Sequence, residues 1–156
     1  PETITRLLDM DLEPFLITAS LQAVLAQRLL RTVCRHCRTP YAPTDEEKDA
    51  LGLPKSWRKD PNLRLFKPKQ HPDGQRIGCA ACDYIGYMGR NGIYELLDVD
   101  ENVCDLILGR AMAFDIRKYA RKQLGMRTLR EEGILKAVKG ITTAAEVLNH
   151  TDKFDD

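Results

Sequence analysis

The sequence predicts an α+β protein that is mostly helical. Apolar residues recur at helical spacing near the N-terminus and through the last third of the chain, whereas the middle is rich in proline and glycine. Of the 156 residues, 43% are apolar and 30% are charged, which is typical of a folded chain and excludes a membrane-embedded protein. The longest uncharged run, Pro14 to Gln27, is too short to span a bilayer. Because the chain opens at Pro1 without an initiator Met, we interpret it as a fragment of something longer.

The N-terminal part contains two apolar segments followed by an ambiguous one. Apolar side chains share one face at helical spacing over 2–10, which predicts a helix. In the next segment, 12–23, Pro14 lies near the start, where the first turn of a helix tolerates proline. The stretch AVLAQRLLRTVC, residues 23–34, fits either a continued helix or a buried strand, and periodicity alone does not decide between them.

The middle of the chain, 38–78, reads as a long irregular stretch with six prolines. Thr44 and Glu47 form a capping-box pattern, which predicts a short helix ending near Leu51. The stretch has few large apolar groups, so we expect that burial alone does not hold it together. Such a segment fits a compact domain only if its ends are tied together.

The C-terminal part starts with glycine-rich turns and continues as helices. Three glycines precede the apolar run 93–97, which predicts a strand leaving turns. From Asp100 the apolar pattern becomes helical, and Gly125 is placed to end one helix. Capping boxes beginning at Thr128 and Thr143 open the last two helices. We expect these helices to form a small bundle.

The cysteines carry the strongest chemical signal. Cys34 and Cys37 form one Cys-x-x-Cys pair, Cys79 and Cys82 form a second, and Cys104 stands alone. An odd count fits a reducing compartment better than a disulfide scaffold. Two tight turns that each supply two thiolates satisfy the tetrahedral preference of structural zinc and leave no position for water. We therefore predict one structural zinc ion per chain, held by the four paired cysteines.

Other interpretations of these residues carry less weight. A redox dithiol is disfavoured because such a site uses one Cys-x-x-Cys at a strand-to-helix turn. The 41 residues between the two pairs, however, exceed the usual spacing of a zinc ribbon. His36 is a less favoured substitute ligand, and Cys104 is expected to be a buried small hydrophobe. Arg35 and Arg38 lie beside the first pair, where they could offset the negative charge of four thiolates.

Catalytic and nucleic-acid signals are weak. The sequence contains neither Gly-x-Ser-x-Gly nor the phosphate-binding Gly-x-x-x-x-Gly-Lys-[Ser/Thr], so no catalytic or cofactor-binding residue is predicted. The 24 Lys and Arg nearly balance the 23 Asp and Glu, which argues against a dedicated nucleic-acid binder. A basic stripe on one predicted helix is interpreted mainly as a solvated face, with contact to acidic lipid or a partner as the alternative. Its members are Arg117, Lys118, Arg121 and Lys122.

Three long strings resemble the C-terminal part of the type II secretion and type IV pilus assembly ATPases, the GspE/PilB family. They cover 4–37, 78–108 and 126–151, and only about 44–75 is variable in that family. The resemblance is carried by Ala-Gln-Arg-Leu around Arg28, by Gly-Tyr-x-Gly-Arg ending at Arg90, and by the paired Cys-x-x-Cys motifs.

The resemblance implies a domain organisation. Residues 1–33 and 90–98 would complete the C-terminal end of a RecA-like nucleotide-binding core, with the ambiguous stretch 23–34 as a strand beside the later one. Residues 34–89 would be an inserted tetracysteine zinc module, and 99–156 the C-terminal helical region.

The resemblance also implies a function for the parent protein. The family is a hexameric motor at the cytoplasmic face of the inner membrane, which uses ATP and Mg²⁺ to assemble pilins or pseudopilins through a membrane platform protein. Its Walker A, Walker B, Asp and His boxes would precede residue 1, so this fragment is expected to be inactive alone. The roles of Arg28 and Arg90 stay open between phosphate contact and, more favoured, pairing with core carboxylates. The alternative function is a free-standing zinc ribbon that binds protein or nucleic acid, disfavoured because the second cysteine pair lacks basic neighbours.

Overall fold

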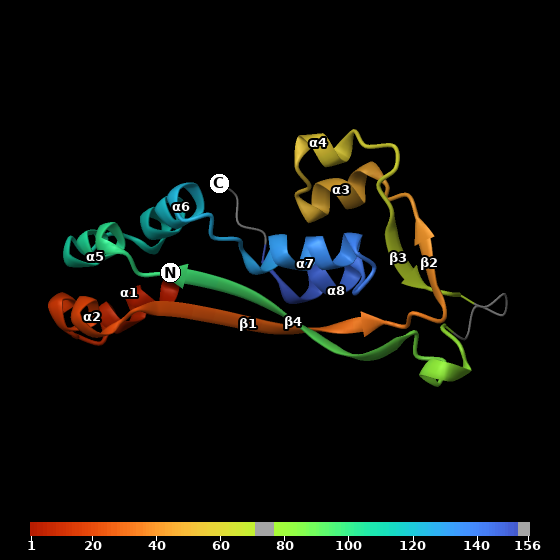
Figure 1. The fold of residues 1–156 in the computed structure, drawn as a ribbon, viewed down its shortest axis with the longest axis horizontal. Coiled ribbons are helices and arrows are strands. Elements are labelled where there is room, and N and C mark those ends of the chain that lie inside the picture. The colour runs from red at the N-terminus through yellow and green to blue at the C-terminus, as the bar shows by residue number, and fades with distance from the viewer. Residues whose placement is uncertain (71–76, 153–156) are drawn as a thin grey trace. The chain divides into compact units, whose positions relative to one another are not determined.

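The computed structural model describes residues 1–70 and 77–152 (Figure 1). In this part of the chain the fold is α+β, as the sequence predicts, with eight α-helices, one short 3₁₀ helix and two two-stranded sheets. The elements in chain order are α1 (Glu2–Asp9), α2 (Pro14–Ser20), β1 (Ala23–Val33), β2 (Arg38–Tyr41), α3 (Asp45–Leu51), α4 (Lys55–Arg58), β3 (Leu65–Pro68), η1 (Ala80–Cys82), β4 (Tyr87–Asp98), α5 (Glu101–Leu108), α6 (Ala113–Gln123), α7 (Leu129–Val138) and α8 (Ala144–His150).

The chain divides into two compact units. Unit 1 contains residues 1–26 and 94–128, and unit 2 contains 27–93 and the C-terminal segment from Leu129. Helices α5 and α6 therefore belong to unit 1, whereas α7 and α8 belong to unit 2 together with all four paired cysteines. The expected single bundle over 99–156 is not confirmed, because its helices are divided between the two units. The RecA-like assignment of the N-terminal part stays a prediction.

Strand β1 settles the ambiguity in the sequence, because AVLAQRLLRTV forms a strand and not a helix. It is hydrogen-bonded to β4, and the two strands run in opposite directions (Figure 1). The neighbouring strands implied by the family resemblance are thus confirmed. Strand β4 starts at Tyr87, six residues before the predicted run at Ile93, and includes Gly89, whose φ of +74° suits glycine.

Unit 1 has its own apolar core under α1, α2, α5 and α6. Its buried members are Ile4, Leu8, Ile17, Leu97, Val103, Ile107, Ile116, Ala120 and Met126. The Asp100 carboxylate caps α5 by accepting the Val103 N–H at 2.8 Å and also accepts the Tyr119 hydroxyl at 2.8 Å. These bonds lower the pKa of Asp100. Arg117 of the predicted basic stripe forms an ion pair with Glu2 and is mostly shielded from solvent.

Unit 2 has a core that the sequence did not reveal. Four leucines of the middle segment, Leu51, Leu53, Leu63 and Leu65, are buried in one cluster with residues of β1, β4, α7 and α8. Complete burial of a leucine contributes about 1.5–3 kcal/mol, so burial stabilises 38–78 more than its composition suggests. The reason is that the leucines pack against helices more than sixty residues later, which local composition does not show.

The predicted helix near Leu51 is confirmed as α3, with the Thr44 hydroxyl accepting the Glu47 N–H at 3.2 Å. Strands β2 and β3 pair antiparallel, with Arg38 opposite Pro68 and Tyr41 opposite Leu65. This pairing returns the chain to the first cysteine pair before the second pair begins. Among the described residues, none of the helices has the length and apolar character needed to cross a bilayer.

Candidate metal centre

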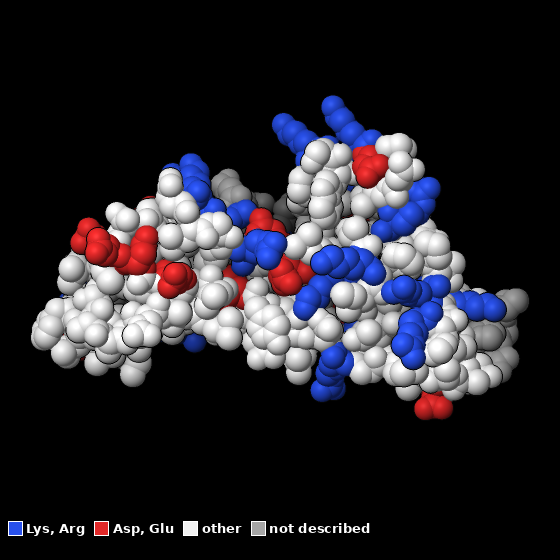
Figure 2. All heavy atoms as spheres, viewed as in Figure 1, with Lys and Arg blue, Asp and Glu red and all other residues white. Residues whose placement is uncertain are grey.

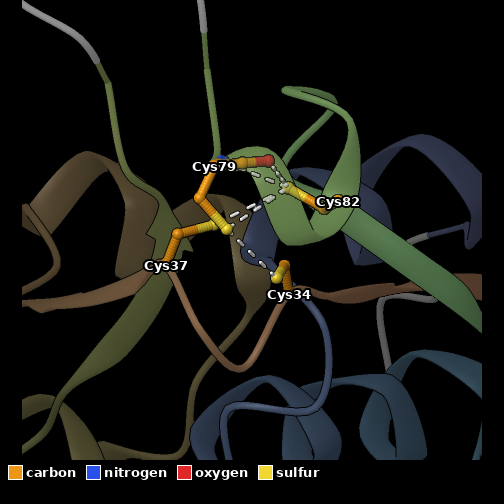
Figure 3. Close-up of side chains that lie close together, drawn as sticks. All are labelled: Cys34, Cys37, Cys79 and Cys82. Atoms are coloured by element: carbon orange, nitrogen blue, oxygen red, sulfur yellow. Dashed lines mark hydrogen bonds between the residues drawn. The ribbon is translucent and has the colours of Figure 1, made fainter.

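The four paired cysteines converge in unit 2, with all four sulfur atoms within 4.8 Å of one another (Figure 3). The Sγ atoms of Cys34 and Cys79 are 4.0 Å apart, and those of Cys37 and Cys82 are 3.9 Å apart. The Sγ atoms of Cys79 and Cys82 are also 3.9 Å apart. Four thiolates placed tetrahedrally at about 2.3 Å from a zinc ion are about 3.8 Å from one another. The donor set and its spacing therefore fit a zinc-sized tetrahedral cation.

The first cysteine pair lies on a tight turn between β1 and β2. The Cys34 carbonyl accepts the N–H of Cys37 at 3.2 Å and the N–H of Arg38 at 2.9 Å. Such a turn directs two thiols three residues apart toward the same side. Because β1 ends at Val33 and β2 begins at Arg38, the sheet strands position the turn.

The second cysteine pair lies on η1, where Cys79 precedes the first residue of the helix. The Cys79 carbonyl accepts the N–H of Cys82 at 3.1 Å and that of Tyr84 at 3.0 Å. The Cys82 sulfur in turn accepts the N–H of Cys79 at 3.2 Å and that of Gly86 at 3.3 Å. Two backbone N–H groups thus point at one sulfur, an arrangement that favours its thiolate form.

Two glycines let the backbone approach the second pair closely. Gly78 has φ +92°, and a Cβ there would lie 2.7 Å from the Cys82 sulfur. Gly86 has φ +82°, and a Cβ there would lie 2.5 Å from the Cβ of Pro68. Both positions need glycine for conformation and for space. The sequence carried a signal for them, because Gly78 directly precedes Cys79 and Gly86 follows Cys82 by four residues.

Backbone hydrogen bonds link the segments that carry the two cysteine pairs. The Cys34 N–H donates to the Gly86 carbonyl at 3.0 Å. The Lys69 N–H donates to the Cys37 carbonyl at 2.9 Å, and the Gly78 N–H donates to the Lys69 carbonyl at 2.6 Å. Four chain segments therefore meet at the cysteine cluster.

The four thiols differ in their surroundings. Cys34, Cys37 and Cys82 are buried, whereas Cys79 is partly exposed. Burial raises the pKa of Cys37 to about 12. The backbone N–H of Cys79 lowers the pKa of Cys82 to about 6, and the N–H of Gly86 acts in the same direction. A divalent cation of soft character is what can hold all four as thiolates, because metal binding displaces the thiol protons.

Other residues weighed as neighbours of a metal take no part in the cluster. His36 is exposed, and Cys104 lies in α5 of unit 1, half-buried and not fully buried as expected. Arg35 is exposed as well. Arg38 instead donates to the Gly140 carbonyl, and its guanidinium lies 4.9 Å from the centre of the Phe66 ring. It therefore ties β2 to the end of α7.

Within the described residues, neither Arg28 nor Arg90 pairs with a core carboxylate, so the favoured expectation is not confirmed. Both side chains are exposed, and neither has a hydrogen bond or an ion pair to a described residue. One arginine that pairs with a buried carboxylate is Arg31, three residues before Cys34. Its role was missed because nothing in the local sequence distinguishes it from Arg28.

The partner of Arg31 is Glu146 of α8, whose side chain is 1% exposed. Its carboxylate accepts the Arg31 N–H at 2.9 Å and the guanidinium Nε and Nη2 at 2.9 and 2.6 Å. Burial raises the pKa of Glu146, but the bonds from Arg31 outweigh it and the net pKa is lowered. Only the N-cap half of the predicted capping box is found: the Thr143 hydroxyl accepts the Glu146 N–H at 3.2 Å, whereas the Glu146 carboxylate binds Arg31.

Comparison with known proteins places this architecture in a family. Residues 1–149 match the family described as Type II/IV secretion system protein. The chain belongs to this family. It is 43% identical over 150 residues to the type IV pilus assembly ATPase PilB of Thermus thermophilus. It is also 40% identical over 148 residues to the type II secretion system ATPase E of Vibrio cholerae, and 39% identical over 148 residues to the type II secretion system protein E of Aeromonas hydrophila.

The likeness covers nearly all of this chain but a minor part of its relatives. The alignments span 95–96% of the chain, 16% of the Thermus thermophilus protein and 27% of each of the other two. The chain therefore corresponds to about a quarter or less of the length of these secretion and pilus proteins.

Proposed function

We propose that this chain works as part of a motor ATPase that assembles pili or secretion pseudopili, and that its own contribution is a structural zinc module. The proposal of a motor rests on membership of the secretion family. The proposal of a zinc module rests on one observation, the convergence of four cysteine sulfurs within 4.8 Å.

The residues that would hold the metal are Cys34, Cys37, Cys79 and Cys82, one zinc ion per chain. Bound zinc would cross-link the two Cys-x-x-Cys turns and supply no Lewis-acid chemistry, because four thiolates complete its shell. The protein itself would position the two turns so that their thiols face one another. Gly78 and Gly86 allow the close approach, and the N–H groups directed at Cys82 support its thiolate.

Nucleotide chemistry belongs, in this proposal, to other parts of a longer protein. The sequence contains no phosphate-binding loop, so ATP and Mg²⁺ would be bound elsewhere. Residues 1–33 and 90–98 would form the edge of a RecA-like core, an assignment supported by the pairing of β1 with β4. The motor would be a hexamer on the cytoplasmic side of the inner membrane, working through membrane platform components and not through nucleic acid.

Elemental analysis of the purified chain tests the metal. We expect one equivalent of zinc in the wild type, loss of zinc in Cys79→Ser, and full zinc in Cys104→Ser, a matched control outside the cluster. A metal content well below one equivalent, or an unchanged content in Cys79→Ser, would contradict the proposal.

The role within the motor needs the longer protein. In a full-length relative that contains this segment, Cys34→Ser should impair secretion or pilus assembly more than ATP hydrolysis, because the four cysteines are not part of a phosphate-binding motif. Normal export, or an equal loss of both activities, would reject a coupling role.

A further inference from the structure

Unit 2 contains a polar hollow of about 420 Å³ that is separate from the cysteine cluster. Strands β1 and β4 and helix α8 contribute its walls. Its lining residues are Leu29, Arg31, Arg90, Glu146, Asn149 and His150. We refer to it as the Arg90 pocket.

The negative charge of the Arg90 pocket is already neutralised. Glu146 is its only acidic lining residue, and both of its carboxylate oxygens accept hydrogen bonds from Arg31. The guanidinium of Arg31 also lies 4.2 Å from the centre of the Tyr87 ring, which fixes its plane. The Arg31–Glu146 pair therefore forms one wall of the pocket, and both carboxylate oxygens of Glu146 already accept hydrogen bonds.

The remaining polar groups of the pocket are mainly donors. Arg90 is exposed and has no hydrogen bond or ion pair to a described residue, so its guanidinium N–H groups are available to a ligand. Asn149 is exposed and adds an amide. The Nδ1 atom of His150 lies 3.0 Å from the Glu146 carbonyl, which leaves Nε2 for other contacts. An anion is the ligand that such a set recognises.

We propose that the Arg90 pocket binds an acidic side chain presented by a partner protein. A guanidinium fork matches a carboxylate with two parallel hydrogen bonds, which gives both affinity and orientation. This inference goes beyond the proposed zinc module and does not depend on it.

The openness of the pocket favours a protein over a small molecule. Leu29 is 50% exposed, the Arg31 side chain 52% and the His150 side chain 45%. Small-molecule sites bury most of their ligand, whereas these walls stay open to solvent. A protein surface would cover the walls while inserting one carboxylate. Leu29 would then contact an aliphatic neighbour of that acidic residue.

The charge of unit 2 supports an acidic partner. Its described residues include 15 Lys and Arg against 10 Asp and Glu, a net charge of +5. Figure 2 shows Lys and Arg side chains gathered over the region of α3, α4, β2 and β3. Such a field attracts an acidic surface over distance and increases its rate of association.

The test uses the zinc-loaded chain and two short peptides as probes. Acetyl-Leu-Glu-Leu-Glu-amide is titrated into the ¹⁵N-labelled protein, with acetyl-Leu-Gln-Leu-Gln-amide as its neutral counterpart. We expect the acidic peptide to shift the amide signals of Arg31, Arg90 and Asn149, and the neutral peptide to leave them unchanged. Arg90→Gln should weaken binding about tenfold, the effect of losing one charge-assisted pair. Arg28→Gln, which removes an exposed β1 arginine outside the pocket, should change affinity less than about twofold.

Two results would overturn the proposal. One is wild-type affinity in Arg90→Gln, measured on protein that retains the wild-type spectrum and zinc content. The other is inorganic phosphate binding as tightly as the acidic peptide and displacing it, which would show a simple anion site and not a docking site for a carboxylate. Both readouts are independent of the zinc measurement, so they separate a failure of this proposal from a failure of the zinc module.

Discussion

Replacing Glu146 by Gln tests how α8 is held against the strand that leads to the first cysteine pair. The Glu146 side chain is 1% exposed, and its two carboxylate oxygens accept hydrogen bonds from different donors of Arg31. One accepts both guanidinium donors of Arg31, and the other accepts the Arg31 N–H. The Thr142 hydroxyl also donates to the Arg31 carbonyl at 2.8 Å, so the strand backbone is bonded on both of its polar groups. Gln keeps the size of Glu but has only one acceptor oxygen.

The cost follows from this geometry. Whichever way the amide is turned, its NH₂ group faces a donor, and that donor loses its partner. An unpaired buried donor or a lost charge-assisted bond costs about 1–3 kcal/mol. Because the Arg31 side chain is 52% exposed, water replaces part of what the guanidinium loses. We expect Glu146→Gln to lower the free energy of unfolding by about 2 kcal/mol, and Glu146→Ala by somewhat more.

The effect should depend on pH in a defined direction. The pKa of Glu146 is lowered from its ordinary value of 4.5 in the folded chain. A lowered pKa means that the carboxylate stabilises the fold fully above pH 4.5 and loses that contribution as the pH falls through the folded-state value. The difference between wild type and Glu146→Gln should therefore be constant near neutrality and shrink below pH 4.5.

Urea denaturation of the zinc-loaded proteins, followed by circular dichroism at pH 7 and at a series of lower pH values, measures this difference. Comparing the variants at each pH cancels the effect of acid on the thiols. Asp49→Asn is the matched control, because it breaks the exposed Arg58–Asp49 pair, and we expect it to cost less than about 1 kcal/mol. If Glu146→Gln costs no more than Asp49→Asn, or if its cost persists unchanged in acid, the reasoning is wrong.

Three further predictions concern the metal, the core and catalysis. Chelating the metal should increase amide hydrogen exchange at 34–37 and 77–86. Helices α5 and α6 should stay protected, because unit 1 has its own core. Equal deprotection of both units would contradict this prediction. Leu65→Ala should destabilise the chain by about 2–5 kcal/mol in urea, and a change below 1 kcal/mol would mean that the middle segment is not anchored by burial. The chain alone should not release phosphate from ATP; turnover that survives a second purification would show a catalytic site that the motifs do not reveal.

Contacts between residues close in the sequence were sufficient to predict part of this structure. The helices capped at Thr44, Asp100 and Thr143 form where predicted, because a cap is a contact between residues three apart. The two Cys-x-x-Cys turns are local in the same sense, and their number and spacing imply that four thiols should meet. The identity of the metal stays a prediction from that donor set.

The tertiary structure decided what depends on partners distant in the chain. In the sequence, Leu51 and Leu65 lie in a proline-rich stretch. Only the fold shows that they share a buried core with residues of α7 and α8. Glu146 read as part of a capping box, and only the fold places its carboxylate against Arg31, 115 residues earlier. Arg90 likewise becomes part of a pocket only when β4 lies beside β1 and α8. Caps and turns are set by backbone geometry over a few residues, whereas burial and ion pairing depend on which surfaces the whole chain brings together.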